Sequence, residues 1–235
     1  MLRLSWACLV TSAFLSNSSG PVSDGRVVTE KLVLVAFGDS LTAGYRSPTW
    51  EEEQPRPTPY TGFLKKRTDE MLEKRGVVGL MVEFLNRGVV GELTEDMVER
   101  FDRDVVEPRP DSVIILGGSN DLGWGLEPPL VAGNLAKMTG EALTEGIRPV
   151  TCTVPSVLGF DEGIQPRMQL NRLIKRYSID HGVVCVDLFS ATGDSAGRLR
   201  KDYSNDGLHL SVAGYEAMAK AIFSDAVRGI VSKRM

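Results

Sequence analysis

The sequence is poor in the residues that build metal sites and disulfide frameworks. It has three cysteines and only two histidines, His181 and His209, among 235 residues. Cys8, Cys152 and Cys185 form no Cys-x-x-Cys pair and no Cys/His cluster, which argues against a zinc site. Cys152 and Cys185 fall in expected strands, where we expect buried free thiols. A disulfide between them stays open as an alternative if those strands are neighbours and the protein is exported.

Charge of one sign and long apolar runs are also scarce. The net charge is −4, with acids and bases mixed along the chain, so neither a basic stripe for nucleic acid nor an acidic tail is present. Residues 4–15 are uncharged and mostly apolar, follow Arg3 and precede the small residues 16–20, the pattern of a secretory signal. A bilayer span takes about 20 apolar residues, so this run is too short for one.

We therefore expect residues 1–20 to be a signal peptide or N-terminal leader. The protein would be exported to the periplasm or medium, without stable membrane insertion after processing. A cytoplasmic location with a packed N-terminal arm is the alternative. A lipid anchor at Cys8 is disfavoured, because little apolar sequence precedes it.

Apolar runs alternate with helical stretches along the rest of the chain, residues 28–235, which we expect to form one domain. Expected strands are 31–37, 80–85, 112–116, 149–154 and 183–186; expected helices are 61–75, 93–106, 129–145, 164–181 and 211–231. The first strand is apolar throughout, which is typical of a parallel strand covered on both faces. The alternation predicts an α/β fold, a parallel sheet with helices on both faces. Thr94 and Ser211 are the expected caps of two helices.

The polar motifs of the sequence follow the expected strands one by one. They are Ser40, the segment 86–91, the segment 117–121, the segment 155–163, and the pair Asp206 and His209. Ligands of parallel sheets bind beyond the carboxyl ends of the strands. We therefore expect these motifs to meet at one edge of the sheet.

Ser40 and the pair Asp206 and His209 have the chemistry of a nucleophile with its base. A serine hydroxyl needs a base to take its proton, and the base needs a partner that fixes its tautomer. The three-residue offset lets Asp206 reach Nδ1 of His209 while Nε2 faces outward. The alternatives are a helix-capping or phosphate-binding serine and a capping aspartate beside a surface histidine. His181, the rival base, is expected at a helix C-terminus, where a cation is favourable.

Three groups could stabilise a developing oxyanion. These are the backbone N–H of Ser40, the backbone N–H of Gly91 and the side-chain amide of Asn120. Gly91 has no side chain to cover its N–H, and two glycines precede Asn120 closely. An asparagine at a strand end is also a common turn residue.

Four motifs in this order resemble the SGNH/GDSL family of serine esterases and lipases. They are Gly-Asp-Ser-Leu around Ser40, Asn-x-Gly-x-x-Gly ending at Gly91, Gly-x-Asn-Asp around Asn120, and Asp-x-x-His at Asp206 and His209. The resemblance spans residues 32–215 and is closest to small bacterial esterases and thioesterases that are similar to lysophospholipases. It implies a flavodoxin-like three-layer α/β/α fold with five parallel strands. It also implies a triad of Ser40, Asp206 and His209, the three oxyanion donors above, and a structural role for Asp39.

One segment departs from that pattern. Residues 46–60 hold four prolines and an acidic stretch with Trp50, Glu51, Glu52 and Glu53, which delays the pair Pro59-Tyr60. Prolines at this density exclude regular structure. A solvated surface loop is the simplest expectation, and a cover for the cleft or a contact between subunits are the alternatives.

We expect a monomeric or small homo-oligomeric hydrolase that cleaves small esters of short to medium acyl chains through an acyl-enzyme. It would need no metal or organic cofactor. Thioesterase and lysophospholipase activities stay open. Acyl selection is expected at Pro155, Val157, Leu158 and Phe160, with core packing as the alternative for these residues. The rival functions are a carbohydrate O-deacetylase with the same triad and a non-catalytic module that binds a small ligand.

Overall fold

The computed structural model describes most of the chain after the expected leader. The described residues are 22–23, 26–27, 29–49, 52, 54 and 56–235. The expected leader at residues 1–20, with Cys8, lies outside them, as do Trp50, Glu51 and Glu53 of the acidic loop.

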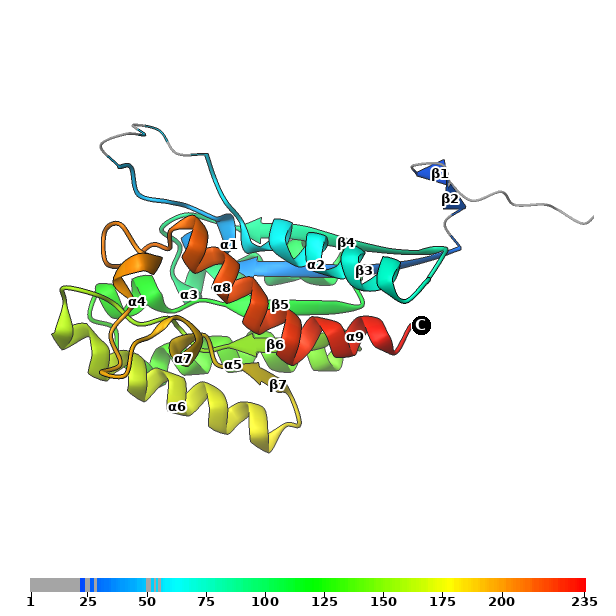
Figure 1. Ribbon diagram of the computed structural model, residues 1–235. Coiled ribbons are helices and arrows are strands. Elements are labelled where there is room, and N and C mark those ends of the chain that lie inside the picture. The colour runs from blue at the N-terminus through cyan, green and yellow to red at the C-terminus, as the bar shows by residue number, and fades with distance from the viewer. Residues whose placement is uncertain (1–21, 24–25, 28, 50–51, 53, 55) are drawn as a thin grey trace, which may run out of the picture.

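Five parallel strands form the central sheet in the order β4-β3-β5-β6-β7 (Figure 1). Their bounds are β3 Glu30–Gly38, β4 Leu80–Gly88, β5 Ser112–Leu116, β6 Arg148–Cys152 and β7 Val184–Val186. In chain order this is the flavodoxin-like arrangement 2-1-3-4-5, which confirms the predicted fold class. A separate two-stranded hairpin, β1 (Val22–Ser23) and β2 (Arg26–Val27), was not expected.

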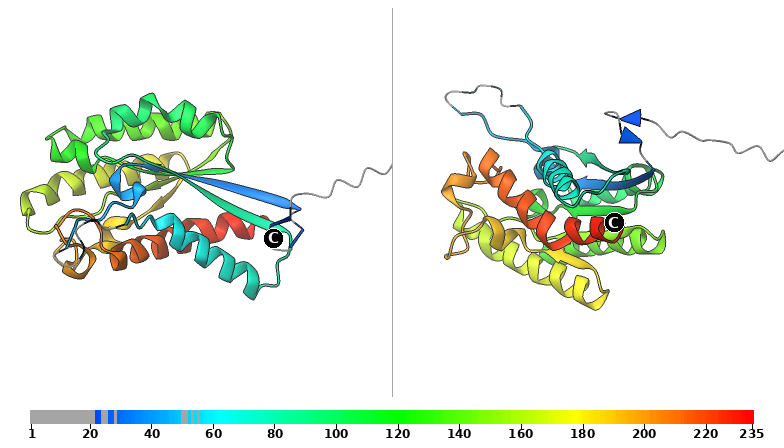
Figure 2. Two further views of the ribbon diagram at one scale, coloured as in Figure 1. Left: turned by 90° about the horizontal axis from the view of Figure 1, so that it is seen from above. Right: turned by 45° about the vertical axis from the view of Figure 1, so that its right-hand side comes forward.

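Helices cover both faces of the sheet, as the two views of Figure 2 show. On one face lie α2 (Tyr60–Lys74), α8 (Val212–Ile222) and α9 (Arg228–Ser232); on the other lie α3 (Thr94–Glu99), α5 (Pro128–Thr144) and α6 (Ile164–Asp180). Three short helices were not expected: α1 (Ser40–Ala43), α4 (Ser119–Gly123) and α7 (Leu188–Thr192). Each is too short to show a helical period in the sequence.

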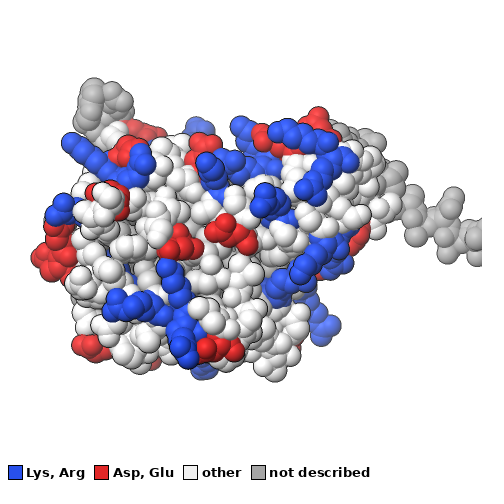
Figure 3. Space-filling model, turned by 60° about the horizontal axis from the view of Figure 1, so that its bottom comes forward, with Lys and Arg blue, Asp and Glu red and all other residues white. Residues whose placement is uncertain are grey.

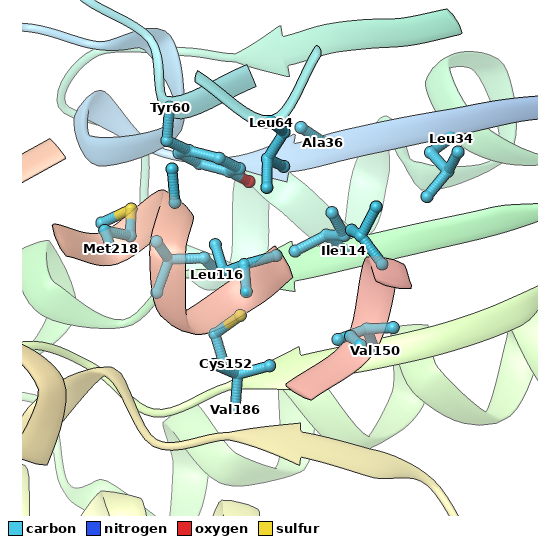
Figure 4. Close-up of a cluster of buried hydrophobic side chains, with 14 of the residues drawn as sticks. Leu34, Ala36, Tyr60, Leu64, Ile114, Leu116, Val150, Cys152, Val186 and Met218 are labelled. Carbon is cyan, nitrogen blue, oxygen red and sulfur yellow. The ribbon is translucent and has the colours of Figure 1, made fainter. Parts of the chain in front are cut away.

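The uniformly apolar strand β3 is explained by two cores, one on each side of the sheet. Leu34 and Ala36 belong to the cluster under α2 and α8, which Figure 4 shows. Val35 and Phe37 point the other way, into the cluster under α3, α5 and α6. All four are fully buried, since alternate side chains of a strand face opposite sides of the sheet. Burial on both sides holds β3 at the centre and fixes where its carboxyl end lies.

Two sequence-based expectations need correction, and a third is confirmed. The segment 86–88 is the end of β4 rather than a loop, because Gly88 pairs with Gly38 in register. Thr94 does not cap α3: the cap position is Leu93. Ser211 does cap α8, and its hydroxyl accepts a hydrogen bond from a backbone N–H.

Cys152 and Cys185 lie on the neighbouring strands β6 and β7, and both are free thiols. Cys152 is buried, as expected, whereas Cys185 is only partly buried.

On the face that Figure 3 shows, Lys and Arg are interspersed with Asp and Glu. The loop at residues 46–60 has no helix or strand in its described part before α2. Arg46 and Glu52 form an ion pair of 3.0 Å across it. No helix in the part of the chain described here is long and apolar enough to cross a membrane.

Candidate active site

Ser40 lies directly beyond the carboxyl end of the central strand β3. It is the first residue of α1, and Asp39 caps that helix by accepting the N–H of Leu41 at 2.9 Å. The Ser40 side chain is mostly covered, with the residue 4% exposed. At this first helical position the Ser40 N–H has no acceptor within the helix, and none occurs elsewhere among the described residues. The turn therefore presents a hydroxyl and a free backbone donor together.

Asp206 and His209 form the contact that their spacing predicts. Nδ1 of His209 lies 2.8 Å from Oδ2 of Asp206. The other oxygen of Asp206 accepts the backbone N–H groups of Leu208 at 2.9 Å and His209 at 2.7 Å. Since Asp206 occupies Nδ1, the Nε2 atom of His209 is left for another partner.

The same contacts control the ionisation of Asp206. Partial burial raises its pKa, but the hydrogen bonds from His209, Ser47 and two backbone N–H groups outweigh burial and lower that pKa to about 2. Asp206 is therefore a carboxylate at any ordinary pH. It can hold an adjacent imidazole in one tautomer and stabilise its charged form.

Tyr45 connects this pair to the Ser40 turn. The rings of Tyr45 and His209 pack edge to face with their centroids 4.5 Å apart. The Tyr45 N–H donates to the carbonyl of Ser40 at 3.0 Å. From α8, the Tyr215 hydroxyl donates to the Tyr45 carbonyl at 2.6 Å. The histidine from the C-terminal part of the chain thus lies against the segment that follows the serine.

No hydrogen bond joins the Ser40 hydroxyl to His209 within the described ranges. Catalytic hydrogen bonds are often long without substrate and tighten only in the complex. The structure brings the two segments together but does not close this contact.

The two other expected oxyanion donors lie beyond β4 and β5. Gly91 has a φ of +81°, a conformation that favours glycine. Its N–H has no acceptor among the residues described. Asn120 uses one amide hydrogen to bond the Glu92 carbonyl at 2.8 Å. No acceptor for its second amide hydrogen occurs in the part of the chain that the structure describes.

Gly88 explains how the end of β4 comes so close to the serine helix. A Cβ built at Gly88 would lie 2.1 Å from the backbone nitrogen of Ala43. Two residues earlier, the Asn86 amide donates to the Thr42 carbonyl at 2.6 Å. The second motif therefore packs its backbone directly onto α1.

Arg100 lies near the carboxyl end of β3, where it bonds the Gly38 carbonyl, and is 8% exposed. It forms ion pairs with Glu92 and Asp104, and its guanidinium stands 4.1 Å from the centroid of the Phe37 ring. Burial lowers the pKa of Arg100, but the hydrogen bonds to the two carboxylates outweigh burial and raise it.

A buried polar cluster lies under the Ser40 turn. Oδ2 of Asp39, Oγ1 of Thr42 and the hydroxyl of Tyr60 have no hydrogen-bond partner in the described structure. Burial raises the pKa of Asp39 to about 7, and the charges of Asp121 and Glu92 add to that rise. Burial also raises the pKa of Tyr60.

Asp121 has a structural contact that its motif alone does not disclose. It is fully buried, and it accepts the Thr94 hydroxyl at 2.6 Å and the Thr94 N–H at 3.1 Å. Asp121, which directly follows Asn120, thereby connects the start of α3 to the motif that contains Asn120.

The residues expected to select the acyl chain divide into two groups. Pro155 and Val157 are buried, and Val157 is 3% exposed, which suits core packing. Leu158 is partly buried and Phe160 is 52% exposed. The Leu158 N–H donates to the Gly207 carbonyl at 2.8 Å, so this loop abuts the segment of Asp206 and His209.

His181 lies away from these residues, at the C-terminal cap of α6 as expected. Its ring stacks on Tyr177 with centroids 3.9 Å apart, and its Nδ1 is 2.8 Å from the Tyr177 carbonyl. These contacts give it no part in the site.

Sequence reasoning did not find Arg100, Glu92 or the buried Arg167. Arg167 is 3% exposed, donates to Ser119 Oγ at 3.2 Å, and its pKa is lowered to about 10 by burial. The chain has 27 Lys and Arg residues, and neither Arg100 nor Arg167 lies in a recognisable motif. Only their burial in the fold distinguishes them.

Comparisons with known proteins find similar sequences and similar structures. The sequence model of the GDSL-like lipase/acylhydrolase family matches residues 36–217. Two curated proteins match in part: the uncharacterized lipoprotein YqeF of Bacillus subtilis, 31% identical over 134 residues, and an arylesterase of Vibrio mimicus, 33% identical over 105 residues. These matches cover 54% and 45% of this chain and 50% and 46% of those proteins, so the chain spans about half the length of each.

Among solved structures, a lipase/acylhydrolase of Enterococcus faecalis is similar with a TM-score of 0.68 and 27% identity. The match covers 86% of this chain and 96% of that one. All four sequence motifs lie within the matched family region.

Proposed function

Because this chain belongs to the GDSL-like lipase/acylhydrolase family, we propose that it is a carboxylic ester hydrolase that works through an acyl-enzyme on Ser40. One observation carries the assignment of residues. The Asp206–His209 pair, with 2.8 Å between Oδ2 and Nδ1, packs through Tyr45 onto the turn that presents Ser40.

The proposed reaction uses the groups of the site in sequence. Ser40 Oγ attacks the ester carbonyl carbon while Nε2 of His209 takes the hydroxyl proton. Asp206 holds the imidazolium that forms. His209 then gives that proton to the leaving alcohol, and later it activates the water that releases the acid.

The developing negative charge would be met by three donors. They are the free N–H groups of Ser40 and Gly91 and the second amide hydrogen of Asn120. Each is positioned by backbone or by a hydrogen bond, so little reorganisation is needed as charge develops. Losing one such donor typically costs about 2.7–4 kcal/mol of barrier.

The test compares Ser40→Ala and His209→Ala with the wild type on a short aryl ester. His181→Ala is the matched control, since it removes the other histidine, whose ring contacts only Tyr177 among the aromatic residues described. We expect turnover to vanish in the first two variants and to persist in the control. Mass spectrometry after fluorophosphonate labelling should locate the adduct on Ser40. Substantial turnover by pure, folded Ser40→Ala protein contradicts the proposal.

For the substrate, we propose esters of short to medium acyl chains. The support is the partly apolar loop of Leu158 and Phe160 beside the Gly207 carbonyl. Leu158→Trp should shorten the acyl chain that is cleaved best, measured over a series of aryl esters from acetate to octanoate. An unchanged profile counts against this placement of the acyl pocket.

A carbohydrate O-deacetylase is the second candidate, and Trp124 is the observation that favours it. Trp124 is 78% exposed, and it ends α4, where its backbone N–H donates to the Asn120 carbonyl at 2.9 Å. An exposed indole four residues along the chain from a proposed oxyanion donor offers a surface on which a sugar ring can stack. Acetate release from acetylated xylan that exceeds the hydrolysis of aryl butyrate would favour this candidate.

We also propose that residues 1–20 direct export and that residues 28–235 are the single hydrolase domain. The similarity to a Bacillus lipoprotein is in line with export. Mass determination of the protein secreted by its host gives the processed N-terminus directly.

A further inference from the structure

Arg100 joins the ends of two strands under the proposed site. Its Nη2 donates to the Gly38 carbonyl at 3.1 Å. That carbonyl also accepts the Val89 N–H at 2.9 Å. Gly38 is the last residue of β3 and stands two positions before Ser40. Arg100 thus bonds the backbone at the base of the nucleophile turn.

The same guanidinium also holds the loop that carries the other donors. Its Nε donates to Oε1 of Glu92 at 2.5 Å, and its Nη2 bonds the second carboxylate oxygen. Glu92 directly follows Gly91, and its backbone carbonyl is the acceptor that orients the Asn120 amide. The Arg100 side chain therefore contacts the turn that carries the Ser40 donor. It also contacts Glu92, which adjoins the Gly91 donor and orients the Asn120 donor.

We propose that Arg100 is a positioning residue that holds the Gly91 and Asn120 donors in register with Ser40. This inference rests on the proposed function of the site. Arg100 does not touch the substrate; it acts through the Gly38 carbonyl and through Glu92.

The Arg100–Glu92 ion pair is better suited to fixing the positions of its neighbours than to stabilising the fold. The side chains of Arg100 and Glu92 are only 8% and 7% exposed. Taking two charges out of water is costly, and buried ion pairs are often replaced by apolar residues without loss of stability. A guanidinium, however, is a planar fork that binds two oxygens in a fixed orientation. The Phe37 ring, 4.1 Å from the guanidinium carbon, holds the plane of that fork.

The experiment replaces the pair together, by Glu92→Met with Arg100→Met, and compares Arg100→Lys as a second variant. The paired replacement removes both charges of the Arg100–Glu92 pair and keeps the Glu92 backbone carbonyl, and Asp104 keeps its ion pair with Arg103. Arg103→Met is the matched control: Arg103 pairs with Asp104, as Arg100 does, but its side chain is 68% exposed, and its hydrogen bonds go to that carboxylate alone.

We expect the paired variant to fold and to lose about 10- to 100-fold in kcat on an aryl ester, since a misplacement of about 1 Å can cost about 100-fold. KM should change less than about threefold, because the donors act mainly in the transition state. Arg100→Lys should fall between this variant and the wild type, since it keeps the charge and loses the fork. Arg103→Met should match the wild type.

A second readout separates positioning from a general loss of structure. The paired replacement is repeated in an Asn120→Ala background. If Arg100 acts through the donors, its removal costs less in kcat there than in the wild type, because one donor is already gone. An equal factor in both backgrounds, or an unchanged kcat in the folded paired variant, overturns the inference.

The two proposals fail in different ways. Absence of Ser40-dependent turnover in the wild type refutes the proposed function and this inference with it. Ser40-dependent turnover that is insensitive to the loss of Arg100 refutes the positioning role alone.

Discussion

Replacing Asp39 by asparagine should make the stability of the protein less dependent on pH between about 4 and 7. Asp39 is 1% exposed and caps α1 through one oxygen, while its other oxygen has no partner in the described structure. Asparagine keeps the capping oxygen, since Asn and Asp are equally good caps. It cannot ionise, so the change removes a buried titration and leaves the local structure in place.

The size of the effect follows from the pKa of Asp39, which burial raises from 3.8 to about 7. An acid with a higher pKa in the native state binds its proton more tightly there than in the unfolded chain. Native stability is therefore full below pH 3.8 and declines as pH rises to about 7. At 1.36 kcal/mol per pKa unit, the loss amounts to about 4 kcal/mol.

The assay is urea unfolding of wild type and Asp39→Asn between pH 4.5 and 8. The free energy of unfolding of the variant, relative to wild type, should rise by about 3 kcal/mol over this window. Other groups titrate equally in both proteins and cancel in the difference.

Asp187→Asn is a control of opposite sign. Asp187 also caps a short helix, α7. Burial raises its pKa, but hydrogen bonds, led by that from Lys175, outweigh burial and lower it. Its contribution to stability is present above the unfolded pKa and is lost on acidification. Asp187→Asn should therefore destabilise more at pH 8 than in acid. A stability difference between wild type and Asp39→Asn that does not vary with pH refutes the argument for Asp39.

Three further changes are predicted from close contacts. Gly88→Ala should cost about 1–3 kcal/mol in urea unfolding, because its Cβ would meet the Ala43 nitrogen at 2.1 Å. Gly133 lies in the exposed part of α5, and a Cβ built there has no atom within 4 Å. Gly133→Ala should therefore stabilise the fold by about 0.5–1 kcal/mol. Similar effects of the Gly88 and Gly133 changes would contradict the crowding at Gly88. Asp206→Asn should lower kcat roughly 10⁴-fold with an unchanged circular dichroism spectrum, because the tautomer of His209 is no longer fixed. A loss below about tenfold would exclude that role.

The layout of the fold was predictable because it depends on long patterns. The apolar run of β3 predicted a strand buried on both faces, and both cores are there. The end of β4 was not predictable from local sequence, since Asn86 to Gly88 have the composition of a turn. Their extension depends on pairing with Gly38, a partner from another strand.

The residues of the candidate site also differ in whether local sequence could predict them. Ser40, Asp206 and His209 were found because short motifs carry them, and the Asp206–His209 contact is local in the chain. Arg100 was not found, because its partners Gly38 and Glu92 come together only after folding. Its sequence context is that of an ordinary surface arginine on a helix.

The hydrogen bond from Tyr215 to Tyr45 has a consequence for the newly made protein. The segment after Ser40 is completed by α8, which is synthesised long after Ser40. At about 5–20 residues per second, the ribosome adds the histidine several seconds or more after the serine. If Ser40 and His209 act as proposed, a nascent or prematurely terminated chain carries the nucleophile without its base and is inert toward the esters of the cell that makes it.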